Sequence, residues 1–383
     1  MLETKPVPAS KWNLAALGMG LFAGSLGVYM VPLQIGTLID GLGLGESEAG
    51  LLGAIEVAAM SLTAIAISPW LSSWSRSRTA FIGIVFAAAC EMLTAFSTQL
   101  FLLFALRAGV GVGCGCAFAA ACSSAASTDS PDRNFGIGQG IMNALFFLLF
   151  PIVPYTLGFH MQRGLFLSLM LVLLLTLPVY RHLINQSVVV NEDVPAKSGI
   201  NWSLTIVHIL ATVLVNLGLG ALWAFVERMG IQNVGLGVET IGRVLSMATI
   251  FMLAGSLFAA WLGTRIGRAI PLALASIFCA IAALMVTRAS TLEIYTAGLF
   301  LYNFFYLFIG PYIIAGTASA LDPSGRLAAA MGGIMFLSYS LGIGTGGFIA
   351  EQLSLAGIGN LAFVSCLLAA PLFALVSIKL SKT

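Results

Sequence analysis

Twelve long runs of hydrophobic residues, separated by short polar breaks, follow one another along the chain. Each run has about 20 residues or more, and a helix of that length crosses a hydrocarbon core of about 30 Å. We therefore predict an all-α integral membrane protein with about twelve transmembrane helices. The predicted spans are 13–39, 48–72, 79–97, 99–127, 136–158, 164–184, 203–227, 238–262, 269–288, 292–318, 327–352 and 359–378.

The polar breaks predict how the spans are organised. Most breaks are very short, so consecutive helices should be antiparallel neighbours. The longest break divides the chain into two halves of six spans each, which suggests an internal repeat. The expected parts are a cytoplasmic tail (1–12), an amino-terminal six-helix bundle (13–184), a cytoplasmic linker (185–202), a carboxy-terminal six-helix bundle (203–378) and a second cytoplasmic tail (379–383).

Composition supports a membrane protein and excludes several other classes. Hydrophobic residues make up 59% of the chain and charged residues 8%, against about 25% charged residues in a typical soluble domain. A formal net charge of +2 gives no reason to expect nucleic acid as a partner. The six cysteines lie in hydrophobic runs without zinc or redox spacing, so we expect no disulfide, no metal and no cofactor. The histidines are scattered, which argues against an enzyme.

The distribution of basic residues predicts the orientation, because cytoplasmic loops carry an excess of Lys and Arg. With the amino terminus inside, the outer side receives at most Arg163, Arg228, Arg243 and Arg288. We therefore expect a multi-pass protein of the cytoplasmic (inner) membrane with both termini cytoplasmic. The inner side receives Lys5, Lys11, Arg76, Arg78, Arg133, Arg181, Lys197, Arg265, Arg268, Arg326, Lys379 and Lys382.

Three charged residues lie well inside the predicted spans of the first half. Arg107 is in the fourth span, Glu56 in the second and Glu91 in the third. Glu91 and Arg107 are each eight residues from the turn near Gln99, so they should face each other across a tight hairpin. An unpaired charge at this depth is costly. We therefore predict that Arg107 is neutralised by Glu56, Glu91 or both.

Two interpretations of these charges remain open. Two carboxylates that share one arginine should not titrate alike, and the less well paired one is a candidate proton carrier. Alternatively, the group is a static ion pair that only holds the bundle together. The alternate glycines that follow Arg107, from Gly109 to Gly115, predict close packing of neighbouring helices.

The second half contains a weaker candidate site. Asn216, Trp223 and Glu227 are spaced by seven and four residues, so they should share one helix face. Glu227 and Arg243 are equally far from Gly235 and could pair near the outer surface, although anchoring at the interface explains them as well. The tenth span is rich in aromatic residues around Asn303 and Tyr306, which suits a pocket for a ring-containing solute, although lipid-facing and packing roles are an alternative for many of them.

The chain resembles a known protein family over essentially its whole length. Arg107, Gly111 and Gly113 match the fourth-span pattern R-x-x-x-G-x-G of the major facilitator superfamily. Residues 260–268, which end in Arg265, Gly267 and Arg268, are similar to the family loop G-x-L-x-D-R-x-G-R, with alanine for the first glycine and threonine for the aspartate. The loop after the second span keeps a leucine and the basic end, Arg76 and Arg78, while Ser73 replaces the aspartate.

The resemblance implies two six-helix bundles that rock about one central substrate site. It implies secondary active transport by alternating access. The carboxylates inside the spans favour protons as the coupling ion, and the arginine and the aromatic residues favour a small organic solute that is anionic or aromatic. The expected partners are the substrate, protons and the lipid bilayer, and the expected state is a monomer. A non-transporting membrane sensor is the alternative, and within transport a drug or metabolite exporter competes with an organic-acid importer. The expected cavity residues are Tyr29, Gln34, Arg107, Asn216, Trp223, Glu227, Asn303 and Tyr306.

Overall fold

The computed structural model describes residues 8–158, 160–185, 201–321 and 326–380. These residues form helices joined by short connections, and an isolated β-bridge joins Arg265 and Gly267. Twelve helical segments within the described ranges are long and apolar enough to cross a membrane, as the sequence predicts. Most of each predicted tail and most of the linker lie outside the described residues. The chain is thus a multi-pass α-helical membrane protein.

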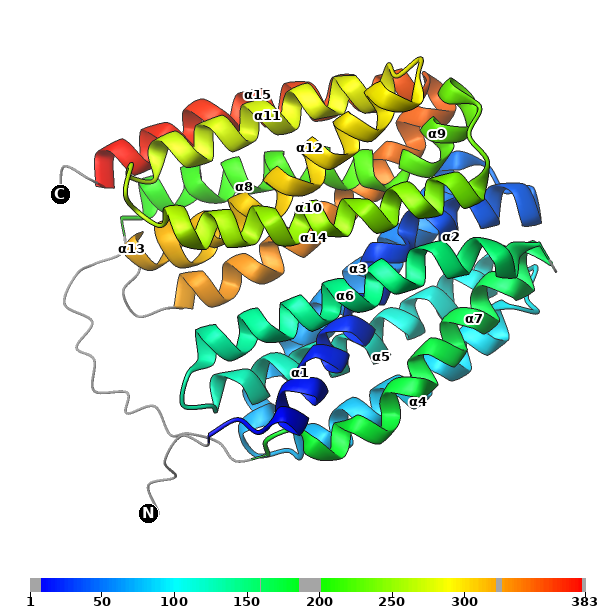
Figure 1. Cartoon of the computed structure of the whole chain (residues 1–383), viewed down its shortest axis with the longest axis horizontal. Coiled ribbons are helices and arrows are strands. Elements are labelled where there is room, and N and C mark those ends of the chain that lie inside the picture. The colour runs from blue at the N-terminus through cyan, green and yellow to red at the C-terminus, as the bar shows by residue number, and fades with distance from the viewer. Residues whose placement is uncertain (1–7, 159, 186–200, 322–325, 381–383) are drawn as a thin grey trace. The chain divides into compact units, whose positions relative to one another are not determined.

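The chain divides into two compact units, each of which forms its own helical bundle (Figure 1). The first unit contains the described residues of Met1–Gly43 and Ile55–Glu192. Within it α5 lies against α4 and α1, and α1 also lies against α6. The helices of this unit are α1 (Lys11–Gly24), α2 (Leu26–Leu42), most of α3 (Glu46–Ile67), η1 (Ser68–Ser72), α4 (Arg76–Thr94), α5 (Leu100–Ala126), α6 (Pro131–Leu157), α7 (Met161–Thr176) and η2 (Leu177–His182).

The second unit contains the described residues of Leu44–Ala54 and Asp193–Thr383, so it includes the start of α3. The backbone N–H of Ser47 donates to Glu351 Oε2 at 2.8 Å, and the Ser340 hydroxyl donates to the carbonyl of Ala54 at 2.7 Å. The helices are α8 (Trp202–Ala224), α9 (Val226–Val234), α10 (Val238–Leu262), α11 (Ala269–Thr287), α12 (Leu292–Pro311), the π-helical η3 (Tyr312–Ala318), α13 (Ser319–Leu321), α14 (Arg326–Gln352) and α15 (Leu355–Leu380).

The first and seventh spans are each interrupted, which a hydrophobic window does not reveal. Ser25, at φ −96° and ψ 3°, separates α1 from α2, and Phe225, at φ −112° and ψ 10°, separates α8 from α9. Both broken spans end on a glycine in the left-handed region, Gly43 at φ 69° and Gly235 at φ 73°. A leucine and a second glycine follow in both cases. The two units therefore share a local sequence and structural pattern, as an internal repeat should produce.

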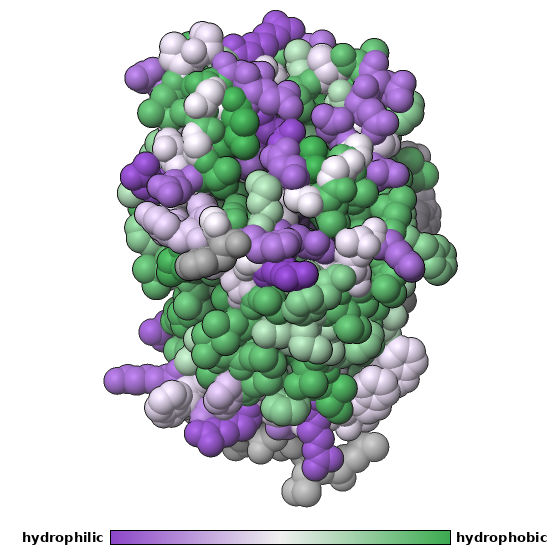
Figure 2. Space-filling model, turned by 90° about the vertical axis from the view of Figure 1, so that its right-hand side faces the viewer, coloured by the Kyte–Doolittle hydropathy of each residue, from purple (hydrophilic) through white to green (hydrophobic). Residues whose placement is uncertain are grey.

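Large hydrophobic side chains lie on the outer flanks of several helices. Ile82 and Phe86 of α4, and Leu171 and Leu175 of α7, are exposed at the surface of the first unit. Contiguous exposed hydrophobic surface of this kind is rare on soluble proteins and suits contact with lipid chains. The helix-end face in Figure 2 shows hydrophobic residues over broad areas, interrupted by groups of hydrophilic residues.

Candidate functional site

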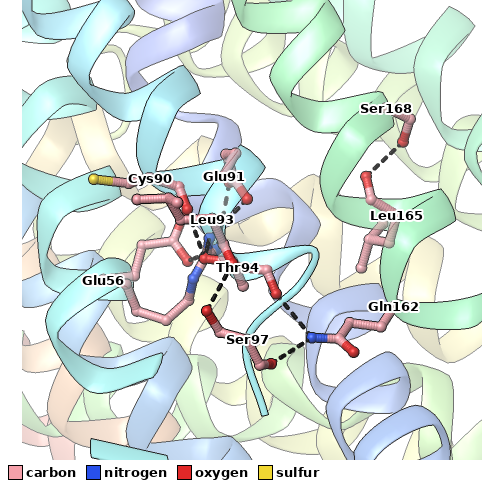
Figure 3. A network of polar contacts seen from close by, with 10 residues as sticks. Glu56, Cys90, Glu91, Leu93, Thr94, Ser97, Gln162, Leu165 and Ser168 are labelled. Atoms are coloured by element: carbon pink, nitrogen blue, oxygen red, sulfur yellow. Dashed lines mark hydrogen bonds and ion pairs between the residues drawn. The ribbon is translucent and has the colours of Figure 1, made fainter. Parts of the chain in front are cut away.

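The candidate site of the first unit is a buried ion-pair cluster around Arg107 of α5 (Figure 3). Its guanidinium binds Glu91 of α4 at 2.6 Å and Glu56 of α3 at 3.2 Å. The exposed fraction of all three side chains is 2% or less. The structure therefore brings together the three charged residues that the sequence places at similar depth, and Arg107 is paired with both acids.

The two carboxylates share the arginine unequally. Glu91 uses both oxygens: Oε2 accepts from Arg107 Nη2 at 2.6 Å, and Oε1 accepts from Nη1 at 3.3 Å. Glu56 uses only Oε2, which accepts from Nη1 at 3.2 Å. Among the described residues Glu56 Oε1 has no hydrogen-bond partner. Bidentate pairing is the stronger arrangement, so Glu56 is the less well paired carboxylate.

Three neutral residues that were not predicted from the sequence complete the surroundings of the arginine. The Thr94 hydroxyl accepts from Arg107 Nη2 at 3.0 Å, and Gln162 Nε2 donates to the Thr94 carbonyl at 2.8 Å. The ring of Phe166 lies 4.8 Å from the guanidinium carbon. Thr94 follows Glu91 by three residues on one helix, a spacing that could have suggested it. Gln162 and Phe166 come from α7, and no local pattern points to them.

Glycines allow the helices to approach one another around this cluster. A side chain at Gly111 would clash with the carbonyl oxygen of Glu56, and one at Gly113 would clash with the carbonyl oxygen of Gly83 on α4. On α2, a side chain at Gly27 would clash with Glu56 Oε1. The predicted packing role of the α5 glycines is confirmed, and Gly27 adds the same role on a third helix.

The predicted cavity residues of the first unit differ in their surroundings. Tyr29 is buried, its ring stacks on Phe146 at 3.8 Å between ring centroids, and its hydroxyl donates to Asn143 at 3.4 Å. Gln34 is 1% exposed and lies beside Glu56, close enough to act on its carboxylate. Gln34 thus belongs to the surroundings of the ion-pair cluster.

Two of the predicted residues of the second unit, Trp223 and Tyr306, stack on the same ring, that of Tyr302. Trp223 of α8 stacks on Tyr302 of α12 at 5.9 Å, and Tyr302 stacks on Tyr306 at the same distance. Asn303 is fully buried; its Nδ2 donates to its own helix, while its Oδ1 makes no hydrogen bond among the described residues. Asn216 is also buried and donates to the carbonyl of Thr212. These groups could hold an aromatic solute that also accepts or donates a hydrogen bond.

Glu227 lies at the start of α9, four residues after Trp223. It is 3% exposed, and its neighbour Arg228 is 9% exposed. Arg243 is exposed, and its Nη2 donates to Thr240 on its own helix. Burial of Glu227 and Arg228 inside the unit argues against interfacial anchoring as their main role.

The predicted conformational loops contain one buried arginine and three that are half-buried or exposed. Arg76 is 3% exposed, and its Nη1 donates to Ser127 Oγ and to the carbonyl of Ile184, both at 2.8 Å. Arg265 is exposed and lies 4.9 Å above the ring of Trp261. Arg268 is half-buried. Arg76 therefore ties the end of η2 to α4 and α5, while Arg265 is available to contact other groups.

The other two predicted residues of these loops, Arg78 and Gly267, are both exposed. Arg78 lies on the exposed side of the first turn of α4. Gly267 has a φ of 72°, in the region that favours glycine, so its place in the loop motif follows from backbone geometry.

No group of three or more His, Cys, Asp or Glu side chains that could hold a metal ion occurs among the described residues.

The fold is that of a multi-pass helical membrane protein with a buried charge cluster in its first unit. The family model of the Major Facilitator Superfamily matches residues 15–347. The chain therefore belongs to the major facilitator superfamily, a family of secondary transporters. This membership indicates a transporter and not an enzyme.

Solved structures share the fold at low sequence identity. A peptide transporter POT in complex with sulfate is 16% identical, with a TM-score of 0.77 over 98% of this chain and 97% of that chain. A POT family transporter in complex with a thioalcohol conjugated peptide is 12% identical, with a TM-score of 0.72 over 96% of each chain. A bacterial homolog of the human lysosomal transporter Spinster is 12% identical, with a TM-score of 0.66 over 97% of each. Comparison with curated proteins gives no match.

Proposed function

We propose that this protein is a proton-coupled secondary transporter of a small organic solute, in which Glu56 carries the proton. The observation that carries the proposal is the unequal sharing of Arg107 by two carboxylates. With both acids ionised, the cluster of one arginine and two carboxylates bears a net charge of −1 in a place almost without solvent contact. A proton on one carboxylate removes that charge, and Glu56 Oε1 is the oxygen that makes no hydrogen bond within the described part of the chain.

In the proposed mechanism, movement of this proton is coupled to movement of the solute through alternating access. In that scheme the protonated and deprotonated forms favour different conformations, so that a proton gradient drives accumulation of the solute. We place the protein in the cytoplasmic membrane with both termini inside, working as a monomer. The arrangement of basic residues along the sequence supports this orientation.

We further propose that the solute contains an aromatic ring or a carboxylate. The stack of Trp223, Tyr302 and Tyr306 beside Asn303 supports a ring-binding surface in the second unit. Short peptides belong in the search because structures of the same fold are peptide transporters. A thermal-shift screen of the purified protein against anionic, neutral and cationic metabolites, including dipeptides, would identify the class.

The test of proton coupling uses proteoliposomes and a solute found in that screen. Glu56→Gln should abolish accumulation driven by a pH gradient, because the side chain can no longer gain and lose a proton. Exchange of labelled for unlabelled solute should persist, because exchange needs no net proton movement. Glu91→Gln serves as the comparison, since Glu91 is held by both oxygens. Gradient-driven accumulation by Glu56→Gln at the wild-type level would refute the proposal.

A further inference from the structure

Gln34 of α2 has a buried side-chain amide to which the proposed proton-coupling mechanism assigns no role. Its side chain is 1% exposed, and among the described residues neither its Nε2 nor its Oε1 makes a hydrogen bond. Burying an amide without partners is unfavourable, and such a group in a native fold calls for an explanation. The neighbour that explains it is Glu56, whose carboxylate lies within its reach.

The geometry identifies which oxygen of Glu56 faces α2. A side chain at Gly27, two turns before Gln34 on the same helix, would clash with Glu56 Oε1. The other oxygen, Oε2, accepts from Arg107. The oxygen that lacks a partner therefore points toward the helix that carries the unpartnered amide.

We infer that Gln34 recognises both protonation states of Glu56 through its two-sided amide. When Glu56 is ionised, its carboxylate accepts a hydrogen bond from Gln34 Nε2. When Glu56 carries a proton on Oε1, that hydroxyl donates to Gln34 Oε1 after the amide turns over. Glutamine suits this task because one side chain offers both a donor and an acceptor. The inference rests on the proposed function and makes Gln34 a positioning residue of the proton site.

The other groups around Glu56 cannot take this role. The titratable groups that act on Glu56 from the neighbouring helices are Arg107 of α5 and Glu91 of α4. Arg107 only donates and is held by Glu91. The thiols of Cys114 on α5 and Cys90 on α4 also face the cluster, but thiols are weak hydrogen-bond partners. Gln34 is therefore the strong neutral donor and acceptor next to the proton site.

The test observes the proton directly and needs no substrate. Infrared difference spectra of the purified full chain in lipid nanodiscs, recorded between two pH values, report the carbonyl stretch of a protonated carboxyl group. The band of Glu56 is the one that Glu56→Gln removes. Gln34→Met keeps the length of the side chain but cannot form either hydrogen bond. Thr37→Val is the matched control, because Thr37 is equally buried one turn further along α2 and its hydroxyl also makes no hydrogen bond to any described residue.

The expected result is a shift of the Glu56 band to higher wavenumber in Gln34→Met, since an acid without a hydrogen bond absorbs there, and an unchanged band in Thr37→Val. If Gln34→Met does not fold, Gln34→Asn, which keeps the amide but shortens its reach, should give the same direction of shift. A band that Gln34 variants leave unmoved overturns the inference while the proposed function stands. A wild-type spectrum without a Glu56 band overturns the proposed function, and this inference with it.

Discussion

Removing the charge of Arg107 should destabilise the protein, and removing the two acids with it should restore stability but not transport. Arg107→Gln leaves Glu56 and Glu91 without a counter-charge at a site that is at most 2% exposed. Breaking a buried pair from one side costs about 3–5 kcal/mol, because a charge is left alone. Four hydrogen bonds to the guanidinium are lost at the same time.

The triple variant Glu56→Gln, Glu91→Gln, Arg107→Gln tests where that cost arises. Three neutral amides of similar size leave no unpaired charge, and replacing a whole buried pair by neutral groups is often close to neutral in stability. We therefore expect an unfolding midpoint near that of the wild type. Transport driven by a pH gradient should nevertheless be absent, because no proton carrier remains.

Arg107→Lys separates charge from geometry. Lysine keeps the charge but lacks the planar fork that binds Glu91 with two parallel hydrogen bonds. We expect a folded protein with strongly reduced transport. Thermal unfolding in detergent, measured beside proteoliposome uptake for all variants, gives both readouts. Wild-type transport by the triple variant would refute the functional interpretation of the cluster and leave it as a static ion pair.

Two further predictions concern packing and conformational change. Gly111→Ala should lower the unfolding midpoint by pushing α3 away from α5, at a cost of about 1–3 kcal/mol. Gly140→Ala on α6 is the control and should not lower the midpoint, because the added methyl group meets no described atom within 4 Å. Equal midpoints for the two variants would contradict the packing argument. Arg265 is exposed, so it can contact groups that come close in one closed state and stabilise that state. Arg265→Ala should therefore change the labelling of single cysteines placed at the two ends of the spans. Labelling that stays the same at both ends would exclude that role.

The twelve spans could be predicted from the sequence because membrane crossing depends on length and hydrophobicity alone. The interruptions at Ser25 and Phe225 could not, because each lies inside a continuous hydrophobic run. The π-helical segment Tyr312–Ala318 after Pro311 is also invisible in a hydropathy profile. Such local geometry depends on packing between helices, which outweighs the preferences of single residues.

The candidate site was predictable where a short connection fixes the register of two helices. Glu91 and Arg107 are equally far from the turn near Gln99, and their pairing follows from that spacing. The third member, Glu56, was predicted from its depth, but its weaker pairing depends on the orientation of one carboxylate relative to a guanidinium already held by Glu91. Differences of a few tenths of an ångström decide that orientation, and no sequence pattern encodes them.

Gln34 illustrates what the family resemblance alone leaves undetermined. Its place in the first span suggested a residue lining the substrate cavity. The structure also puts the amide beside Glu56, on the helix whose Gly27 lies against Glu56 Oε1. In the proposed scheme, the helix that lines the transport path also contacts the proton site. A change of protonation at Glu56 would thus act on α2 directly, by exchanging one hydrogen bond of Gln34 for another, without needing Arg107 to leave Glu91.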